Sequence, residues 1–271
     1  MKDENEQVVK LLLQMQGFDV SKFDENFLNK SSKSRAVETN SRPMDAYNQL
    51  PDGNTGKGTN FIHPMSISYS EFFRNSMTFS ALERIVLPVI VHQRLNSQRP
   101  EIRIWSAACA SGQESYSIAI LLKEVIGNKN INFRIFATDL SDEQIEYAHK
   151  GNYSSSEIGY MSLNRLNRWF VKHGNVYSVK DELKEQIEFS TFDLLNDQYS
   201  CPPASIFGDF DLIFCANILF YYKPEFRTFI LKKTSSSLSK NGFFITGETE
   251  REILLQHHFQ EAYPHSAIFT V

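Results

Sequence analysis

From about residue 100 onward, short apolar runs alternate with segments in which apolar residues recur at helical spacing. The short runs predict strands at 101–107, 131–139, 186–193, 210–217, 242–248 and 266–271. The intervening segments predict helices at 115–126, 142–150 and 224–238. This alternation predicts an α/β fold with a mostly parallel, doubly wound sheet and helices on both of its faces. Ligands of such sheets bind beyond the carboxyl ends of the strands.

The beginning of the chain follows another pattern. Apolar residues at 8–15 predict one short helix that ends near Gly17, and turn-forming residues dominate the stretch 51–60. We therefore expect a small, mostly helical N-terminal region with a loose linker over residues 1–66, and a main domain over residues 67–271.

Composition and charge narrow the class of protein. The formal net charge is −4, which argues against nucleic-acid binding as the main role. The three cysteines have neither a disulfide nor a metal-site spacing, so we expect reduced thiols and no metal. The first residues do not resemble a secretory signal, and no run approaches the roughly 18 apolar residues of a membrane span. We expect a cytoplasmic protein without membrane insertion.

Small side chains fill the turn between the strand at 101–107 and the helix that follows. The turn reads Ala108-Cys109-Ala110-Ser111-Gly112, and its only glycine is the last residue. Small residues let a ligand approach the backbone, and a helix N-terminus offers unpaired amides. A dinucleotide loop has three glycines, so this turn favours a ligand without a pyrophosphate, such as S-adenosylmethionine. The alternative is a plain capping box formed by Ser111 and Glu114.

Two aspartates end predicted strands next to this turn. Asp139 lies where an acidic side chain commonly holds ribose hydroxyls. Its alternative role is to cap the next helix, which Ser141 can also do. Asp193 is a candidate for the adenine edge of a ligand, or it begins a turn.

Several motifs together resemble one family. The stretches SISYSEFFRN (66–75), IWSAACASGQESYSIA (104–119), FATDLSDEQIEYAHKGNYS (136–154) and the segment 210–250 are similar to the CheR family of chemotaxis receptor glutamate methyltransferases. The resemblance implies methyl transfer from S-adenosylmethionine, with S-adenosylhomocysteine as product, to glutamates on the cytoplasmic domain of a chemoreceptor. It also implies a Rossmann-like class I methyltransferase domain with a small helical N-terminal domain.

The resemblance assigns roles by position within these motifs. It implies catalytic roles for Arg74 and Tyr221, which would otherwise be interpreted as a surface ion-pair partner and a half-buried aromatic residue. The implied cofactor contacts are Ser70, Arg74, Ala108, Glu114, Asp139, Asp193, Leu194 and Asn217. A glutamate acceptor is already ionised at neutral pH, so the predicted site needs positioning groups and no strong base.

The chain departs from the family pattern at several positions. Gln113 replaces an acidic residue, Ser115 a proline, Ala216 an arginine and Glu248 a histidine. These departures keep one alternative open, a non-catalytic or differently targeted relative that binds S-adenosylmethionine or S-adenosylhomocysteine and acts as a partner-binding module.

Two regions of the sequence bear on how the protein would bind a receptor. The N-terminal region offers only Lys30, Lys33 and Arg35 where the family has an arginine-rich helix facing the receptor. Residues 173–189 occupy the place of a small β-subdomain, but they are few and lack the glycine-rich pattern of relatives that capture a receptor tail by strand addition. We therefore expect no tethering through a tail peptide.

Overall fold

The computed structural model describes residues 20–27, 70–159 and 161–271. The chain divides into two units, Met1–Tyr69 with Leu219–Arg227, and Ser70–Ile218 with Thr228–Val271. The predicted helix at 8–15, the linker and the basic residues Lys30, Lys33 and Arg35 lie outside the described residues.

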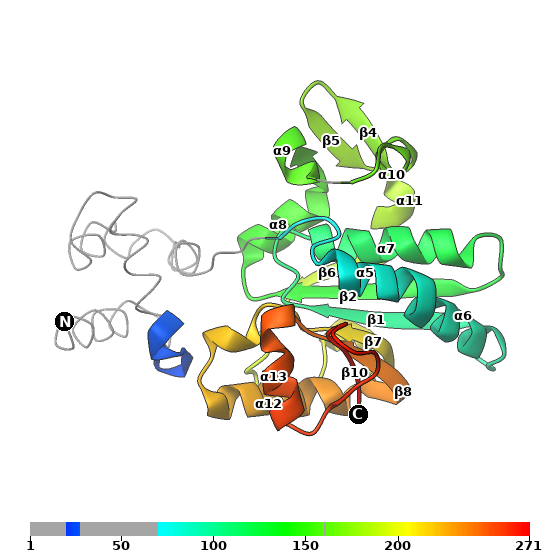
Figure 1. The fold of residues 1–271 in the computed structure, drawn as a ribbon. Helices are drawn as coiled ribbons and strands as arrows, with labels where there is room; N and C mark the ends of the chain where they lie inside the picture. The colour runs from blue at the N-terminus through cyan, green and yellow to red at the C-terminus, as the bar shows by residue number, and fades with distance from the viewer. Residues whose placement is uncertain (1–19, 28–69, 160) are drawn as a thin grey trace, which may run out of the picture. The chain divides into compact units, whose positions relative to one another are not determined.

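A seven-stranded sheet forms the centre of the larger unit, in the order β6-β2-β1-β7-β8-β10-β9 (Figure 1). Its strands are β1 Glu101–Ala107, β2 Asn132–Asp139, β6 Ile187–Thr191, β7 Phe210–Phe214, β8 Leu238–Ile245, β9 Gln260–Glu261 and β10 Ile268–Thr270. The pairs β1–β2, β1–β7, β2–β6 and β7–β8 are parallel, whereas β10 runs antiparallel to β8 and β9. The predicted α/β class with a mostly parallel sheet is confirmed.

Helices cover both faces of this sheet. Helices α6, α7 and α8 lie on one face, and α12 and α13 lie on the other (Figure 1). The helices are α5 Ser76–Ala81, η2 Leu82–Val86, α6 Leu87–Leu95, α7 Gln113–Ile126, α8 Asp142–Lys150, α12 Pro224–Ser236 and α13 Arg251–Gln256. Strand β1 and helix α7 are buried along most of their length, because the sheet and its covering helices enclose them. The hydrophobic core therefore lies directly beneath the turn at 108–112.

A separate three-stranded sheet has the order β3-β5-β4. Its elements are β3 Asn152–Ser154, α9 Ser155–Ile158, α10 Leu163–Trp169, β4 Phe170–His173, β5 Val176–Val179 and α11 Asp181–Lys184. The small sheet thus spans residues 152–179, earlier in the chain than the expected range 173–189. Residues 187–191 belong instead to the main sheet, because Ile187 pairs with Ile135 of β2.

The remaining short elements are η1 Val20–Lys22, η3 Pro203–Ser205, η4 Leu219–Tyr221 and η5 Glu248–Glu250. Within the unit that contains Leu219–Arg227, the amide of Lys223 donates to the carbonyl of Lys22 at 3.0 Å. Arg227 pairs with Asp24 at 3.3 Å. These contacts join η1 to the loop after β7.

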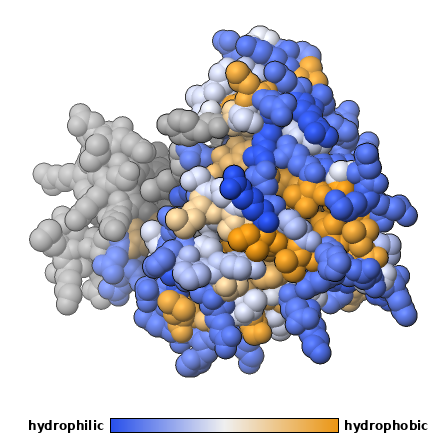
Figure 2. All heavy atoms as spheres, turned by 45° about the vertical axis from the view of Figure 1, so that its right-hand side comes forward, coloured by the Kyte–Doolittle hydropathy of each residue, from blue (hydrophilic) through white to orange (hydrophobic). Residues whose placement is uncertain are grey.

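The helical run from α5 to α6 is apolar on more than one side. Phe79, Leu82 and Val86 face the core, while Met77 is 55% exposed and Ile85 40% exposed. Apolar side chains also gather on the face of the molecule shown in Figure 2. Within the described ranges, no helix combines the length and apolarity that crossing a bilayer requires.

A buried ionic cluster lies near the beginning of β1 and β7. The carboxylate of Asp211 accepts the Nε–H of Arg94 at 2.7 Å and the amide of Arg103 at 2.9 Å. The Arg103 guanidinium donates to the carbonyls of Gly208 and Ser205, at 3.0 and 2.6 Å. The cluster fixes the loop before β7 at the end of the sheet opposite the turn at 108–112.

The substitution Asp211→Asn should lower the free energy of unfolding by about 2 kcal/mol, because an amide has one oxygen for two buried donors. Asp209→Asn should change it by less than about 0.5 kcal/mol, since Asp209 is 49% exposed and 3.8 Å from Arg94. Urea denaturation of both variants measures the difference. Equal effects would contradict the assigned importance of the cluster.

Candidate active site

The turn at 108–112 connects β1 to α7 in an unusual backbone conformation. Ala108 and Ala110 have φ of 69° and 48°, and Gly112 has φ of 91°. A Cβ atom at Gly112 would lie 2.8 Å from the Cβ of Ala148, so only glycine fits there. The left-handed alanines require other contacts to hold them, because this region is unfavourable for residues with a Cβ.

Those contacts come from the end of β2 and from the small sheet. The Cys109 amide donates to the carbonyl of Thr138 at 2.8 Å, and the Ala110 amide donates to Oδ2 of Asp139 at 2.9 Å. The hydroxyl of Tyr153 donates to the carbonyl of Ser111 at 2.7 Å. The turn is therefore anchored to two other elements before any ligand binds.

The capping-box interpretation of Ser111 and Glu114 is wrong. Helix α7 begins at Gln113, and its N-cap, Gly112, has no side chain to offer. Ser111 Oγ instead donates to the side chain of Gln113 at 2.7 Å. Glu114 instead accepts a hydrogen bond from the buried hydroxyl of Ser106 at the end of β1, at 2.7 Å.

Asp139 bridges two segments at the carboxyl end of β2. Besides the Ala110 amide, its carboxylate accepts the amide of Ser141 at 3.0 Å. Burial raises the pKa of Asp139, and these amide hydrogen bonds partly offset the rise. Ser141 caps α8 by accepting the amide of Gln144, which confirms that Asp139 is not needed as the cap.

Glu114 lies in the first turn of α7, partly buried, with Ser106 Oγ at 2.7 Å from its Oε1. Burial raises its pKa to about 7, against the opposing effects of the Ser106 hydrogen bond and the charge of Arg74. The nearby carboxylate of Glu250 raises this pKa further. The site thus holds a carboxyl group that changes charge near neutral pH, and a cationic ligand would favour its ionised form.

Arg74 reaches the site from a tight turn before α5. Its neighbours Phe73 and Asn75 have φ of 55° and 67°. The Phe73 amide donates to Ser117 Oγ on α7 at 3.0 Å, and the guanidinium of Arg165 lies 4.8 Å from the Phe73 ring. Asn75 caps α5 by accepting the amide of Thr78. Because α7 also carries Glu114, this contact holds the residue before Arg74 against the helix of its acidic neighbour.

Asn217 follows β7 with φ of 61°. The backbone N–H of Asn217 donates to Oε2 of Glu250 at 2.7 Å. Glu250 is completely buried, and sequence reasoning did not single it out as a site residue. The available signal was its place at the end of the motif Gly247-Glu248-Thr249-Glu250, two residues after the departure at Glu248.

Two buried thiols lie among these carboxyl groups. Cys109 is in the turn, and Cys215 follows β7. Burial raises the pKa of both thiols, and nearby carboxylates raise it further, Asp139 and Glu114 for Cys109, and Glu250 and Glu114 for Cys215. The thiols are therefore protonated at neutral pH and take part as apolar packing groups.

For the other predicted site residues, the structure shows no contact with Glu114, Asp139 or Glu250 among its described hydrogen bonds and ring contacts. Asp193 Oδ1 accepts the amide of Leu195 at 2.8 Å, the turn arrangement that was its alternative, and Leu194 is buried. Ser70 is half-buried, at the beginning of the larger unit. Tyr221 belongs to the other unit, where its ring centroid lies 4.5 Å from that of Phe27. The ligand contacts of these residues stay predictions.

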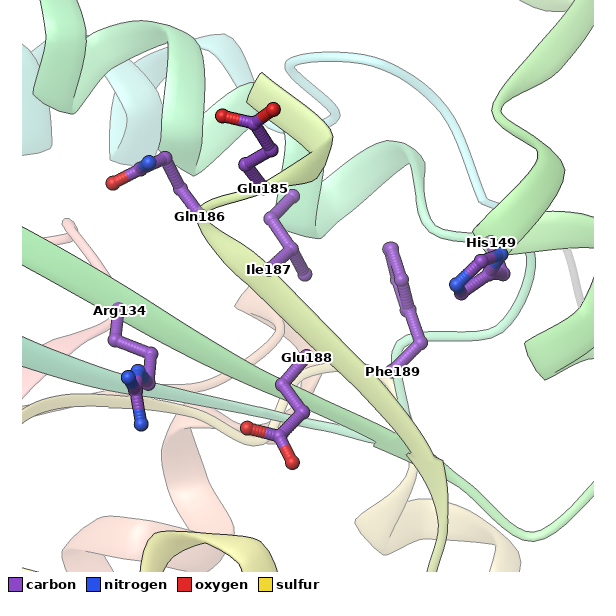
Figure 3. A pocket seen from close by; sticks show the side chains of 7 residues that line it. All are labelled: Arg134, His149, Glu185, Gln186, Ile187, Glu188 and Phe189. Carbon is purple, nitrogen blue, oxygen red and sulfur yellow. The ribbon is translucent and has the colours of Figure 1, made fainter. Parts of the chain in front are cut away.

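A shallow hollow lies along β6, the edge strand of the main sheet (Figure 3). It is lined by Arg134, His149, Glu185, Gln186, Ile187, Glu188 and Phe189. Ile187 and Phe189 point to one side of the strand and Glu188 to the other (Figure 3). None of the predicted site residues lines it. The hollow is therefore separate from the residues at the carboxyl ends of the strands, Arg74, Glu114, Asp139, Asn217 and Glu250, which we call the strand-end cluster.

Comparisons with known proteins agree on one family. A family described as CheR methyltransferase, SAM binding domain, matches residues 68–266. A chemotaxis protein methyltransferase of Borreliella burgdorferi is 30% identical over 92% of this chain and 88% of its own. A chemotaxis protein methyltransferase of Listeria monocytogenes is 34% identical over 70% of this chain and 68% of its own. The corresponding Escherichia coli protein is 30% identical over 76% of this chain and 68% of its own.

The fold, the strand-end cluster and these matches define a methyltransferase domain that binds S-adenosylmethionine. The chain belongs to the CheR methyltransferase family.

The variant Glu114→Gln should be more stable than the parent at pH 8, by at most about 3 kcal/mol, since one pKa unit corresponds to about 1.4 kcal/mol. The folded-state pKa of about 7 exceeds the ordinary 4.5, so stability falls as the pH rises between these values. The gain should therefore disappear at pH 4. Glu124→Gln, on the outer side of α7, is the control and should show no such gain, because Glu124 pairs with Arg165 at 2.7 Å. Denaturant midpoints across this pH range measure both, and a pH-independent gain would contradict the assignment.

Proposed function

We propose that this protein transfers a methyl group from S-adenosylmethionine to glutamate side chains of a chemoreceptor-type signalling protein, forming methyl esters. The observation that supports this most is the cluster at the strand ends, where the charge of Arg74 acts on the carboxyl group of Glu114, on a helix that begins at the small-residue turn. Membership of the CheR methyltransferase family supports the same activity.

The residues present suit such a cofactor. S-adenosylmethionine carries a cationic sulfonium and an amino-acid portion, and it supplies an electrophilic methyl group. The carboxylates of Glu114 and Asp139 offer negative charge to the cationic and hydroxyl groups. Ala108 and Ala110 have small side chains and are only half-buried, so a ligand can approach the backbone of the turn at these residues.

The acceptor chemistry explains why the cluster contains no strong base. A glutamate side chain has an ordinary pKa near about 4.3 and is already a nucleophilic carboxylate at neutral pH. The protein then needs to hold that carboxylate in line with the methyl group and to exclude water. Arg74 suits this role, because its exposed guanidinium can form charge-assisted hydrogen bonds with a carboxylate. Tyr221 is proposed to help orient the acceptor.

The partner follows from the same proposal. A chemoreceptor carries its methylated glutamates on its cytoplasmic domain, so the proposal includes a cytoplasmic location. Capture of a receptor tail peptide by the small sheet is not expected.

Incubation with a labelled methyl donor and a cytoplasmic receptor fragment, followed by mild alkali, tests the activity. A glutamate methyl ester releases its label in alkali, whereas a base-stable product would indicate another acceptor. Binding of S-adenosylhomocysteine without transfer to any receptor fragment would favour the non-catalytic alternative that the departures at Gln113 and Ala216 keep open.

Arg74→Ala should reduce methyl transfer at least about 100-fold and leave the protein folded, because the acceptor carboxylate loses its charged partner. Arg84→Ala is the matched control, since Arg84 is an exposed arginine in η2 and lies outside the cluster. Initial rates with saturating donor compare them. A near-normal rate for Arg74→Ala would remove this residue from the site.

Asp139→Ala should weaken the binding of S-adenosylhomocysteine by about 1–3 kcal/mol, or roughly 5- to 150-fold, the size of a lost charged hydrogen bond. Asp142→Asn, at the beginning of α8 and exposed, should leave affinity unchanged. Titration calorimetry measures both variants. An unchanged affinity for Asp139→Ala would exclude a role in cofactor binding.

A further inference from the structure

We propose that Glu250 is a positioning residue for cofactor binding, which acts by holding the backbone of Asn217 at the carboxyl end of β7. The inference rests on the proposed function, because it needs Asn217 to face the cofactor. It concerns a residue that contacts only protein groups in the described contacts and that the motif resemblance left without a role.

The geometry around the carboxylate is specific. A single oxygen, Oε2 of Glu250, accepts the amide of Asn217 at 2.7 Å, the hydroxyl of Thr246 at 2.9 Å and the amide of Gly247 at 3.0 Å. The residue is 0% exposed, so water does not compete for these donors. A buried carboxylate is costly unless such hydrogen bonds compensate it.

The three hydrogen bonds of Glu250 differ in which parts of the chain they connect. Those to Thr246 and Gly247 are local, and the bond to the Gly247 amide caps the short helix η5. The bond to Asn217 joins two segments 33 residues apart in sequence, the loop after β7 and the loop after β8. Helix capping therefore accounts for the local contacts, and the contact with Asn217 requires a further explanation.

Asn217 needs such support. Its φ of 61° is a left-handed conformation, which asparagine adopts more readily than other residues with a Cβ but less readily than glycine. A Cβ at Gly247 would lie 2.8 Å from Oδ1 of Asn217, so the glycine allows the asparagine side chain to lie against this loop. Glu250 and Gly247 together determine the direction in which the Asn217 side chain leaves the strand end.

The location connects this contact to the rest of the cluster. Glu250 and Glu114 lie close enough for the charge of one to affect the ionisation of the other, and both affect the thiol of Cys215. The charge of Arg74 acts on the same Glu114 and lowers its pKa. The Glu250 contact thus lies among the charged groups that the proposed function assigns to the cofactor site.

Titration calorimetry with S-adenosylhomocysteine tests the inference in the full-length protein. Affinity should fall in the order parent, Glu250→Gln, Glu250→Met. The amide keeps one oxygen acceptor and should weaken binding about 3-fold, whereas methionine removes it and should weaken binding at least about 10-fold. Asp211→Asn is the matched control, a buried carboxylate that accepts two hydrogen bonds at the other end of the sheet, and it should leave this affinity unchanged.

A double-mutant cycle separates positioning from general destabilisation. Asn217→Gly removes the side chain and keeps the left-handed backbone, so adding Glu250→Gln to it should cause little further loss of affinity. In steady-state assays, the Glu250 variants should raise KM for the donor and leave KM for the receptor fragment unchanged.

Additive losses in the cycle, or parental affinity in Glu250→Gln and Glu250→Met, would overturn the inference and leave the methyltransferase proposal intact. If the methionine variant does not fold, the cycle with Glu250→Gln decides alone. A parent protein that fails to bind S-adenosylhomocysteine would instead overturn the proposed function.

Discussion

The hydrogen bond from the Ala110 amide to Asp139 is the interaction on which the site depends. It connects the turn after β1 to the end of β2 and stabilises a backbone in which two alanines are left-handed. The start of α7, and with it the position of Glu114, follows from that turn. Arg74 is in turn fixed to α7 through the amide of Phe73. One carboxylate thus determines the geometry of a cluster drawn from distant parts of the chain.

Much of the fold could be predicted from the sequence, because strands and helices in such a sheet have distinct apolar periodicities. The main strands and helices occur close to their expected ranges. The small sheet was placed too late, since β3 has only three residues and gives no readable alternation. A local motif gave a wrong prediction where a tertiary contact competes with it. Glu114 accepts a hydrogen bond from Ser106 of β1 and does not cap its own helix.

The site was partly predictable for a related reason. Residue type and position at a strand end suggested Asp139, because parallel strands bring their carboxyl ends to one edge. Glu114 was suggested only by the family resemblance. The role of Glu250 could not be read this way, since its key partner, Asn217, is 33 residues away and is contacted through a backbone amide. The positive φ of Phe73, next to Arg74, is likewise not visible in a residue type that rarely adopts it.

The buried thiols at the strand ends affect how the protein responds to oxidants and alkylating agents. Oxidants and electrophiles attack the thiolate form of exposed cysteines, whereas Cys109 and Cys215 are buried and have raised pKa values. The function of the strand-end cluster should therefore be insensitive to peroxide and alkylating agents. Cys201, which is partly exposed in the loop before η3, is the thiol that a modifying reagent would reach first.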